Sequence, residues 1–373
     1  MDDKKKAAPI IDIQKVFGRS PDQHILNVVR ESCQDAFSLP SFADTLQTIK
    51  SHFFARNYDA VFQNPAHLPV YSARYAPSRA LCYYHTFLEH PVLMKILEGG
   101  PSTILCIGSG AGSELVGISA AMVHANPAPK TKKKAGSDKK GTDTSVKRAG
   151  NISKEKPPAE EDAIQSTSDG AILGLEGQSL TSSNDNTIAE PESTEGVASK
   201  IAKSKKMPKS DKHQVTIVIQ DYVDWSTVLT PMETVVRARM KLGPERLHCE
   251  TEIGNVLDLS EGLLDRVAKA DLITFLFVLN ELFQDKKRTM LLVAKMVAAM
   301  PQGAHMLVVD SAGSFSNLRV GERTYMVYML LDHLKDLEIV YQDDAIWYRC
   351  PPGVTYPLKL ENMRHFIRIY RKL

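Results

Sequence analysis

Three glycines at alternate positions are the part of this sequence whose residue types and spacing could support chemistry. Gly108, Gly110 and Gly112 follow the apolar run 103–107 and precede a stretch, 113–123, that is compatible with a helix. Glycine reaches backbone angles that a Cβ forbids, and it lets a ligand approach the main chain closely. Free amide groups at the helix start would face that ligand. We therefore expect a ligand-binding turn here, with close packing of helix on strand as the alternative.

The glycine spacing separates two classes of cofactor. A dinucleotide-binding fingerprint requires Gly-x-Gly-x-x-Gly, and Ser113 occupies the place of its third glycine. The spacing Gly-x-Gly-x-Gly is that of S-adenosyl-L-methionine (SAM) sites. The sequence therefore favours a methyl donor over a nicotinamide.

A carboxylate at the end of a later strand supports this interpretation. Asp221 ends the β-rich run 215–221, and in a doubly wound sheet such a residue accepts hydrogen bonds from ribose hydroxyls, usually ~20 residues after the glycine loop. Gly112 and Asp221 are 109 positions apart. Removing the segment 127–213, which differs from the rest in composition, restores the expected spacing.

Segment 127–213 contains no Phe, Tyr or Trp and is rich in Lys, Ser, Thr, Gly, Pro and Asp. Such a segment cannot bury enough apolar surface to offset the entropy lost on ordering, so we expect a long disordered insertion. Its ends are basic and its middle is acidic. The basic ends could bind RNA non-specifically or act as a nuclear address, and an insertion with neither role is the alternative.

The residues before the glycine turn predict an N-terminal helical extension. Ranges 21–38 and 41–63 carry apolar residues at helical spacing, and a further helix is expected over 78–98. The segment 71–79 joins them and concentrates aromatic and basic side chains. It could cover the substrate, because tyrosine stacks on bases and arginine binds phosphates, or its arginines could bridge the helices to the sheet. The candidate substrate-binding residues are Tyr71, Arg74, Tyr75 and Arg79.

The pattern after the insertion is that of an alternating α/β fold. Helices are expected over 225–241, 285–300 and 322–335, and strands over 246–253, 270–279, 305–310, 345–349 and 364–371. The chain thus divides into a helical cap with the Tyr- and Arg-rich segment (1–100), the first part of a SAM-binding domain (101–126), the insertion (127–213) and the rest of that domain (214–373).

Net charge, cysteine content and the length of apolar stretches limit the classes of partner. The 373-residue chain has a formal net charge of +2, so a nucleic-acid surface must be a local patch. Its five cysteines show no zinc spacing, which predicts a reducing compartment and no metal. No signal peptide and no apolar stretch of spanning length is present, so we expect an intracellular soluble protein without a membrane partner.

Taken together, these elements resemble the class I SAM-dependent methyltransferases. Segments 71–81, 107–112 and 279–283 and the interrupting insertion are similar to the fungal methyltransferases that modify N(3) of a uridine in large-subunit ribosomal RNA. The resemblance implies a doubly wound, Rossmann-like sheet of seven strands with one antiparallel strand. It also implies ribosomal RNA or a pre-ribosome as partner. We expect a monomer in the nucleus, nucleolus or cytoplasm.

The resemblance also implies roles for individual residues. The glycine turn would wrap the methionine part of SAM, Asp221 would hold its ribose, and Asn280 would lie near the transferred methyl group. Many class members have a carboxylate two residues before the first glycine, where this chain has Cys106. Glu114 either replaces it or only favours the helix dipole. The implied cofactor-binding residues are Gly108, Ser109, Gly110, Gly112, Asp221, Tyr222, Asn255, Val256 and Asn280, of which Asn255 and Val256 would border the adenine.

For a uridine N(3) target, the nucleophile is an imide nitrogen that carries a proton at neutral pH, so a base is required. Glu281 is our candidate, since it follows the fourth strand where open α/β sheets place their sites, and Asp310 is the alternate catalytic residue. Capping of the following helix or pairing with a lysine is the structural alternative for Glu281. Methylation of a protein or a small molecule, and a non-catalytic binding module, stay open as other functions.

Overall fold

The computed structural model describes residues 12–125, 214–313, 317–320 and 323–373, with the backbone alone for 317–320 and 323–325. The insertion expected over 127–213 lies outside the described residues. The chain leaves the described part after Ala125, which ends the helix α8 (Ser113–His124), and returns at Gln214, directly before β2 (Val215–Asp221). The described residues form one compact unit.

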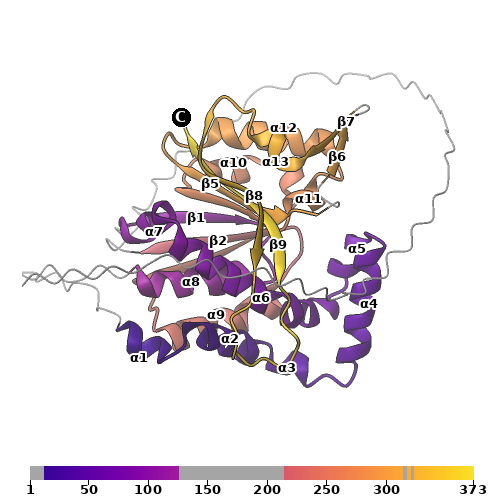
Figure 1. The fold of residues 1–373 in the computed structure, drawn as a ribbon, viewed down its shortest axis with the longest axis vertical. Helices are drawn as coiled ribbons and strands as arrows, with labels where there is room; N and C mark the ends of the chain where they lie inside the picture. Colours follow the sequence, from indigo (N-terminus) through magenta and orange to yellow (C-terminus); the bar gives the residue numbers. More distant parts are fainter. Residues whose placement is uncertain (1–11, 126–213, 314–316, 321–322) are drawn as a thin grey trace, which may run out of the picture. The chain divides into compact units, whose positions relative to one another are not determined.

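A seven-stranded sheet is the centre of this unit, and its strand order is β3-β2-β1-β4-β5-β9-β8 (Figure 1). β1 to β5 are parallel, and β9 runs antiparallel to both of its neighbours. The prediction of a doubly wound sheet of seven strands with one antiparallel strand is therefore confirmed. Besides β2, the strands are β1 (Ser102–Ile107), β3 (Leu247–Ile253), β4 (Leu272–Leu276), β5 (His305–Ser311), β8 (Leu337–Tyr348) and β9 (Met363–Lys372).

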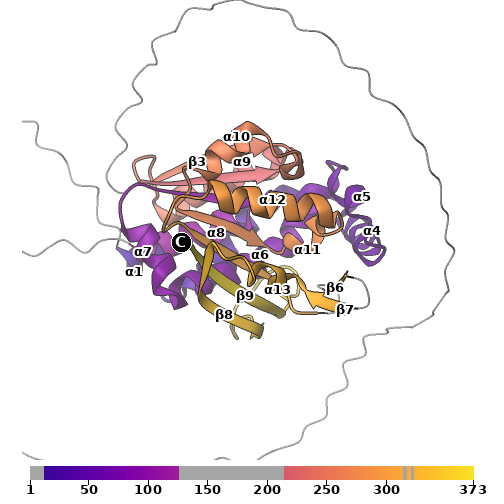
Figure 2. The ribbon, with the colours of Figure 1, turned by 90° about the horizontal axis from the view of Figure 1, so that it is seen from above.

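Helices cover both faces of the sheet (Figure 1), and β3 and β8 lie at opposite edges (Figure 2). On one face, α6 (His67–Glu89) packs against α8, and α9 (Ser226–Met240) lies beside α8. On the other face lie α10 (Glu261–Val267), α12 (Lys286–Ala299) and α13 (Val327–Leu331). The remaining helices are α1 (Ile13–Phe17), α2 (Pro21–Ser32), α3 (Gln34–Phe37), α4 (Phe42–Phe54), α5 (Tyr58–Phe62), α7 (Pro91–Glu98), α11 (Leu279–Leu282) and the 3₁₀ turn η1 (Val256–Asp258).

The start of α6 differs from the expectation, which placed a connecting segment over 71–79 and a helix only from 78. That segment lies inside α6, with Pro77 in the helix interior. Proline has no N–H, so the carbonyl four residues earlier loses its helical partner. This carbonyl, of Ala73, instead accepts a hydrogen bond of 2.8 Å from the Tyr356 hydroxyl. A contact from a remote part of the chain thus replaces the bond that proline removes.

The connection between the last two strands, 349–362, holds α6 in place. Arg74 of α6 donates to the carbonyl of Lys359 at 2.7 Å and forms an ion pair with Glu361. The Ser78 hydroxyl accepts from the amide of Glu361 at 3.2 Å. For Arg74, the structure therefore shows the bridging alternative: this side chain ties the helix to the end of the chain.

Other elements end earlier or begin elsewhere than the sequence predicts. The strand expected over 270–279 stops at Leu276, because Phe277 has a left-handed φ of 58°. The helix expected over 322–335 is only α13, and its first residues instead form β7 (Arg323–Met326), paired with β6 (Asn317–Val320). Pairing with a neighbouring strand here decides the local structure, although the apolar residues have helical spacing. The helices expected over 21–38 and 41–63 each divide in two, and β8 begins eight residues before the strand expected from 345.

Candidate cofactor and substrate site

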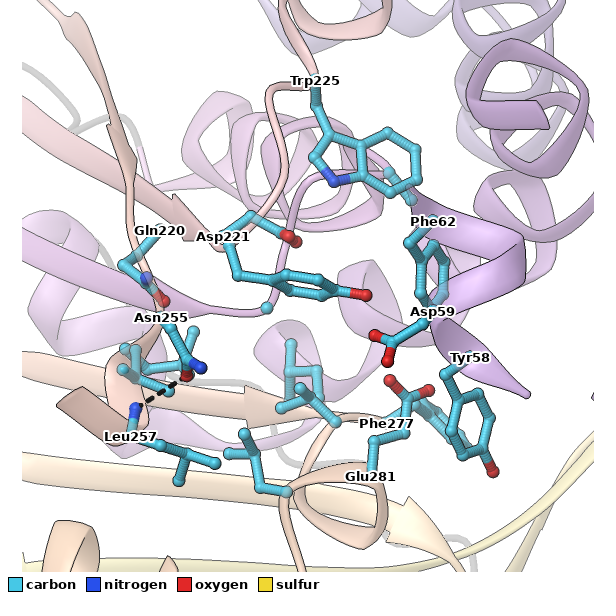
Figure 3. Close-up of a pocket in the computed structure, with 18 of the residues that line it drawn as sticks. Tyr58, Asp59, Phe62, Gln220, Asp221, Trp225, Asn255, Leu257, Phe277 and Glu281 are labelled. Carbon is cyan, nitrogen blue, oxygen red and sulfur yellow. Dashed lines mark hydrogen bonds between the residues drawn. The ribbon is translucent and has the colours of Figure 1, made fainter. Parts of the chain in front are cut away.

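A cavity of about 320 Å³ lies at the carboxyl ends of the parallel strands. Its lining comes from the ends of β1, β2, β3 and β4, with α5 and α6 closing it from the helical side. Strand order reverses between β1 and β4, and open α/β sheets bind ligands at such a switch point. In Figure 3 the labelled lining residues converge on this space, some from the chain before the insertion and some from the chain after it. The cavity is therefore the candidate site of this protein.

The glycine turn forms one wall of the cavity. Gly108 and Gly112 have φ of +66° and +83°, angles that favour glycine. Gly110 has no such angle, but a Cβ there would lie 2.0 Å from Cδ1 of Trp225. Gly108 lines the cavity, whereas Gly110 and Gly112 pack against side chains of the fold. Close packing, one of the two alternatives that the sequence left open, is thus shown for this turn, and ligand binding at Gly108 stays a prediction.

Asp221 connects the turn to the end of β2. One oxygen of its carboxylate accepts from the amide of Gly110 at 3.0 Å, and the other accepts from the amide of Val223 at 3.1 Å. Burial raises the pKa of Asp221, and these hydrogen bonds oppose that rise. The carboxylate therefore organises the turn and also borders the cavity.

Two further carboxyl groups in the cavity have strongly raised pKa values. Burial raises the pKa of Glu281 to about 8, and burial raises the pKa of Glu114 to about 8 as well. The charge of nearby Arg79 lowers both values, and Asp221 raises both. Burial also raises the pKa of Asp310 to about 6. Carboxyl groups that titrate near neutral pH are typical of sites that exchange protons or bind cations.

Arg79 brings a positive charge into this acidic site. It donates to the Tyr71 hydroxyl at 2.9 Å. Its guanidinium carbon lies 5.2 Å from the ring centre of Phe277 and 5.8 Å from that of Tyr75. Rings on several sides fix the guanidinium within reach of the carboxyl groups.

Helix α5 covers the cavity on the side opposite the sheet. Tyr58, Asp59 and Phe62 all line it. In Figure 3 the carboxyl groups of Asp59 and Glu281 face the same part of the space. The Phe62 ring lies 5.9 Å from that of Trp225, which connects α5 to the glycine turn. The helical extension therefore contributes part of the site itself.

The structure brings together only some of the residues proposed from the sequence. Lining residues among them are Tyr71, Arg79, Gly108, Asp221, Tyr222, Asn255, Val256 and Glu281. Five more proposed residues lie behind the wall as supports: Tyr75, Ser109, Gly110, Gly112 and Asn280. Asp310 also lies behind it, where its carboxylate accepts from the amide and the side chain of Asn280 at 3.0 and 2.6 Å. Arg74 points to the 349–362 connection.

Sequence reasoning missed several lining residues, namely Tyr58, Asp59, Phe62, Gln220, Trp225 and Phe277. Tyr58 and Phe62 belong to the range 41–63, whose apolar residues at helical spacing are typical of a core, and that pattern does not distinguish a cavity wall from a core. Trp225 follows Asp221 by four residues, and no spacing rule marks it. Phe277 is marked only by its backbone angle, which is absent from the sequence.

The donor set of the cavity fits SAM. The carboxylate of Asp221 borders the space and is a suitable acceptor for ribose hydroxyls. The surrounding carboxyl groups are suitable neighbours for the sulfonium cation. Apolar side chains such as Val256, Leu257 and Val278 offer a surface for the adenine. Within the part of the chain that the structure describes, no cluster of His, Cys, Asp and Glu is arranged to hold a metal ion. Among the same residues, no helix is long and apolar enough to cross a membrane.

Comparison with known families decides the class of the chain. The profile of a family described as SAM-dependent methyltransferase matches residues 29–371. This chain belongs to that family. SAM is thus the methyl donor of this methyltransferase, as the glycine spacing predicted.

Individual relatives were found by sequence and by structure. The 25S rRNA (uridine(2843)-N(3))-methyltransferase of Saccharomyces cerevisiae is 27% identical over 353 residues, which are 88% of this chain and 78% of that protein. An O-methyltransferase family protein from Burkholderia thailandensis has a TM-score of 0.38 at 9% identity, and the match covers 96% of this chain and 76% of that one. TehB from Haemophilus influenzae has a TM-score of 0.26 at 15% identity, covering 43% and 50%. The family assignment rests on the sequence match.

The raised pKa of Glu114 predicts how stability of the methyltransferase depends on pH. A carboxyl whose pKa rises from 4.5 to about 8 on folding holds its proton more tightly in the native state. The free energy of unfolding therefore falls as pH rises between these values, by an amount on the order of a few kcal/mol for one such group. We expect Glu114→Gln, which mimics the protonated form, to remove part of this fall. Urea unfolding at several pH values measures it.

The exposed Glu98 at the end of α7 provides the matched control. Glu98→Gln makes the same chemical change outside the cavity and leaves the pH dependence of unfolding as in the wild type. An equal pH dependence in Glu114→Gln and the wild type would show that Glu114 is ionised at little cost, contrary to the expectation.

Proposed function

We propose that this methyltransferase transfers the methyl group of SAM to N(3) of a uridine in large-subunit ribosomal RNA. The observation that carries the proposal is Glu281, a half-buried carboxyl with a pKa of about 8 that faces the cavity at the end of β4. The activity named for the yeast relative supports the same substrate. The proposed place of action is therefore a ribosomal RNA or a pre-ribosome, in the nucleus, nucleolus or cytoplasm.

The chemistry of the target requires a group such as Glu281. N(3) of uridine lies between two carbonyls and carries a proton at neutral pH, so its lone pair becomes nucleophilic only as the proton leaves. A base is most effective when its pKa lies near the working pH, and burial brings Glu281 into that range. In the proposed mechanism, the ionised carboxylate of Glu281 takes this proton. Before this transfer, the positive charge of Arg79 favours the anionic form of the base, and the transfer converts it to the neutral acid.

The remaining residues bind and align. SAM supplies the methyl group when bound and leaves as the neutral S-adenosylhomocysteine. We assign its ribose to Asp221 and Tyr222, its adenine to Asn255 and Val256, and its methionine part to the glycine turn beside Gly108. Carboxyl groups around the cavity favour the cationic donor over the neutral product, which aids turnover. Alignment of the two reactants supplies much of the remaining rate enhancement.

Mapping of the product tests the proposal. The purified protein is incubated with isotope-labelled SAM and with ribosomal RNA or pre-ribosomes from a strain that lacks the gene. Mass spectrometry of the digested RNA then identifies the methylated nucleoside. We expect 3-methyluridine in large-subunit RNA, and no product from Asp221→Ala. Binding of SAM without RNA methylation would overturn the substrate and direct the search to proteins and small molecules.

A further inference from the structure

An exposed aromatic and basic cluster lies on the β8–β9 strand pair. It is at the end of the sheet where the parallel strands have their carboxyl ends, which is also the end that holds the cavity. Trp347 is 56% exposed, and the guanidinium carbon of Arg349 lies 5.8 Å from the centre of its ring. Arg364 of β9 is the cross-strand partner of Trp347. Residues paired in this way share one face of a sheet. We call Trp347, Arg349 and Arg364 the edge platform.

The platform is close to the catalytic end of the sheet. Arg364 accepts at its carbonyl a hydrogen bond of 3.3 Å from Ala312, two residues after Asp310. The neighbouring His365 places its ring 6.3 Å from that of Phe277, which lines the cavity. From β4 to β8 the sheet spans three strand spacings, roughly 14 Å. An extended polymer can therefore contact the platform and the cavity at once.

The charges of the platform distinguish it from the rest of β9. Arg368 is paired with Asp332 and Asp344, and Arg371 is paired with Glu338. Within the described residues, Arg349 and Arg364 form no ion pair, and both are exposed. Ile346 and Tyr348, on the other face of β8, pack against the core. The indole of Trp347 points away from them and is exposed, so it adds little to the packing of the fold. Two unpaired cations beside an exposed ring are therefore available to a partner.

We propose that the edge platform binds single-stranded RNA next to the target nucleotide. A flanking base stacks on the indole, and flanking phosphates bind Arg349 and Arg364. Stacking on an aromatic ring is tolerant of sequence, and arginine matches phosphate geometry. Inside the cavity, Arg79 is held by the Tyr71 hydroxyl and faces the carboxyl groups of Glu281 and Glu114, whereas Arg349 and Arg364 lie outside it and are available to the flanking phosphates. This inference rests on the proposed function.

Fluorescence anisotropy with a 5′-fluorescein oligouridylate 12-mer and the full chain tests the platform. We expect Trp347→Ala to weaken binding at least about fivefold without changing its salt dependence, and Trp347→Phe to retain most of the affinity. Arg364→Ala should weaken binding and reduce the slope of log K against log salt by about 0.7, one phosphate contact. Arg371→Ala is the matched control. Arg371 lies on the same strand, but it pairs with His305 at the start of β5, at the end of the sheet away from the cavity. It should bind like the wild type.

Two outcomes of the binding assay would overturn the platform: Trp347→Ala that binds as tightly as the wild type, or equal losses from Arg364→Ala and Arg371→Ala. Calorimetric titration with SAM should give wild-type affinity for all four variants, which excludes loss of the fold as the cause. The same variants in the ribosomal RNA assay separate the two proposals. Platform-dependent RNA binding without 3-methyluridine contradicts the function alone. Wild-type levels of 3-methyluridine from Trp347→Ala at limiting RNA contradict the platform alone.

Discussion

Glu281→Gln is expected to lower the single-turnover rate of methyl transfer by about 100-fold or more at neutral pH, the usual contribution of a positioned base. Glutamine keeps the size and hydrogen-bonding capacity of the side chain but cannot accept the imide proton. The affinity for SAM should change much less than the rate. Rapid-quench measurement with saturating SAM and RNA gives the rate, and calorimetric titration gives the affinity.

The pH dependence of this rate identifies the role of Glu281 further. In the wild type, the rate should rise with pH and reach a plateau above the apparent pKa of Glu281. This pKa should lie at or below 8, the value in the ligand-free protein, because a bound cation lowers the pKa of a neighbouring carboxyl. The Glu281→Gln profile should lack this step. Glu114→Gln is the matched variant, because it removes a carboxyl of similar pKa from the same cavity. Equal losses from the two variants would indicate an electrostatic effect and contradict the assignment of Glu281 as the base.

Gly110→Ala is expected to weaken SAM binding by about 100-fold, although the substitution adds one methyl group. The new Cβ would lie 2.0 Å from the Trp225 ring, which is buried beside Phe62 and Tyr71 with ring centres 5.9 Å away in both cases. The ring cannot yield, so the turn must move, and overpacking of this kind costs about 1–3 kcal/mol. Displacement of the turn also breaks its hydrogen bond to Asp221 and misplaces groups that align the reactants.

Calorimetric SAM titration and urea unfolding measure the two effects of Gly110→Ala. Gly262→Ala is the control, because a Cβ at Gly262 in α10 meets no atom within 4 Å. The double variant Gly110→Ala with Trp225→Leu should recover part of the lost affinity, since the smaller side chain leaves room for the methyl group. Wild-type affinity in Gly110→Ala would show that the turn adapts without loss, contrary to the geometry.

Local patterns in the sequence were sufficient for the sheet and for the glycine turn. The turn and the carboxylate of Asp221 obey spacing rules that follow from backbone geometry, so composition and counting could find both. The first half of α6 could not be found in this way, because Pro77 normally ends a helix, and here the carbonyl that it leaves without a partner is hydrogen-bonded by Tyr356 instead. The end of β4 depends on one backbone angle, at Phe277. These features depend on contacts across the fold.

The candidate site shows the same division. Residues at strand ends, such as Glu281, were found because topology alone brings the ends of parallel strands together. For the Tyr- and Arg-rich segment, the sequence left two alternatives, a cover over the substrate and a bridge from the helices to the sheet, and in a helix its side chains diverge. Tyr71 and Arg79 face the cavity, while Arg74 contacts the 349–362 connection. Asp59 comes from a helix remote in sequence, and no local pattern places it there.

The point at which the chain leaves and re-enters the described part has an evolutionary consequence. Ala125 and Gln214 both adjoin the amino edge of the sheet, where Gln214 accepts a hydrogen bond of 3.1 Å from Ser102 at the start of β1. Every lining residue of the cavity is at the other edge or in the helices above it. The strand ends that form the cavity can therefore meet whatever the number of residues between these two points, and we expect this number to vary between members of the family. A wide spread of insertion lengths among family members that keep Asp221 and Glu281 would bear this out, and a fixed length would contradict it.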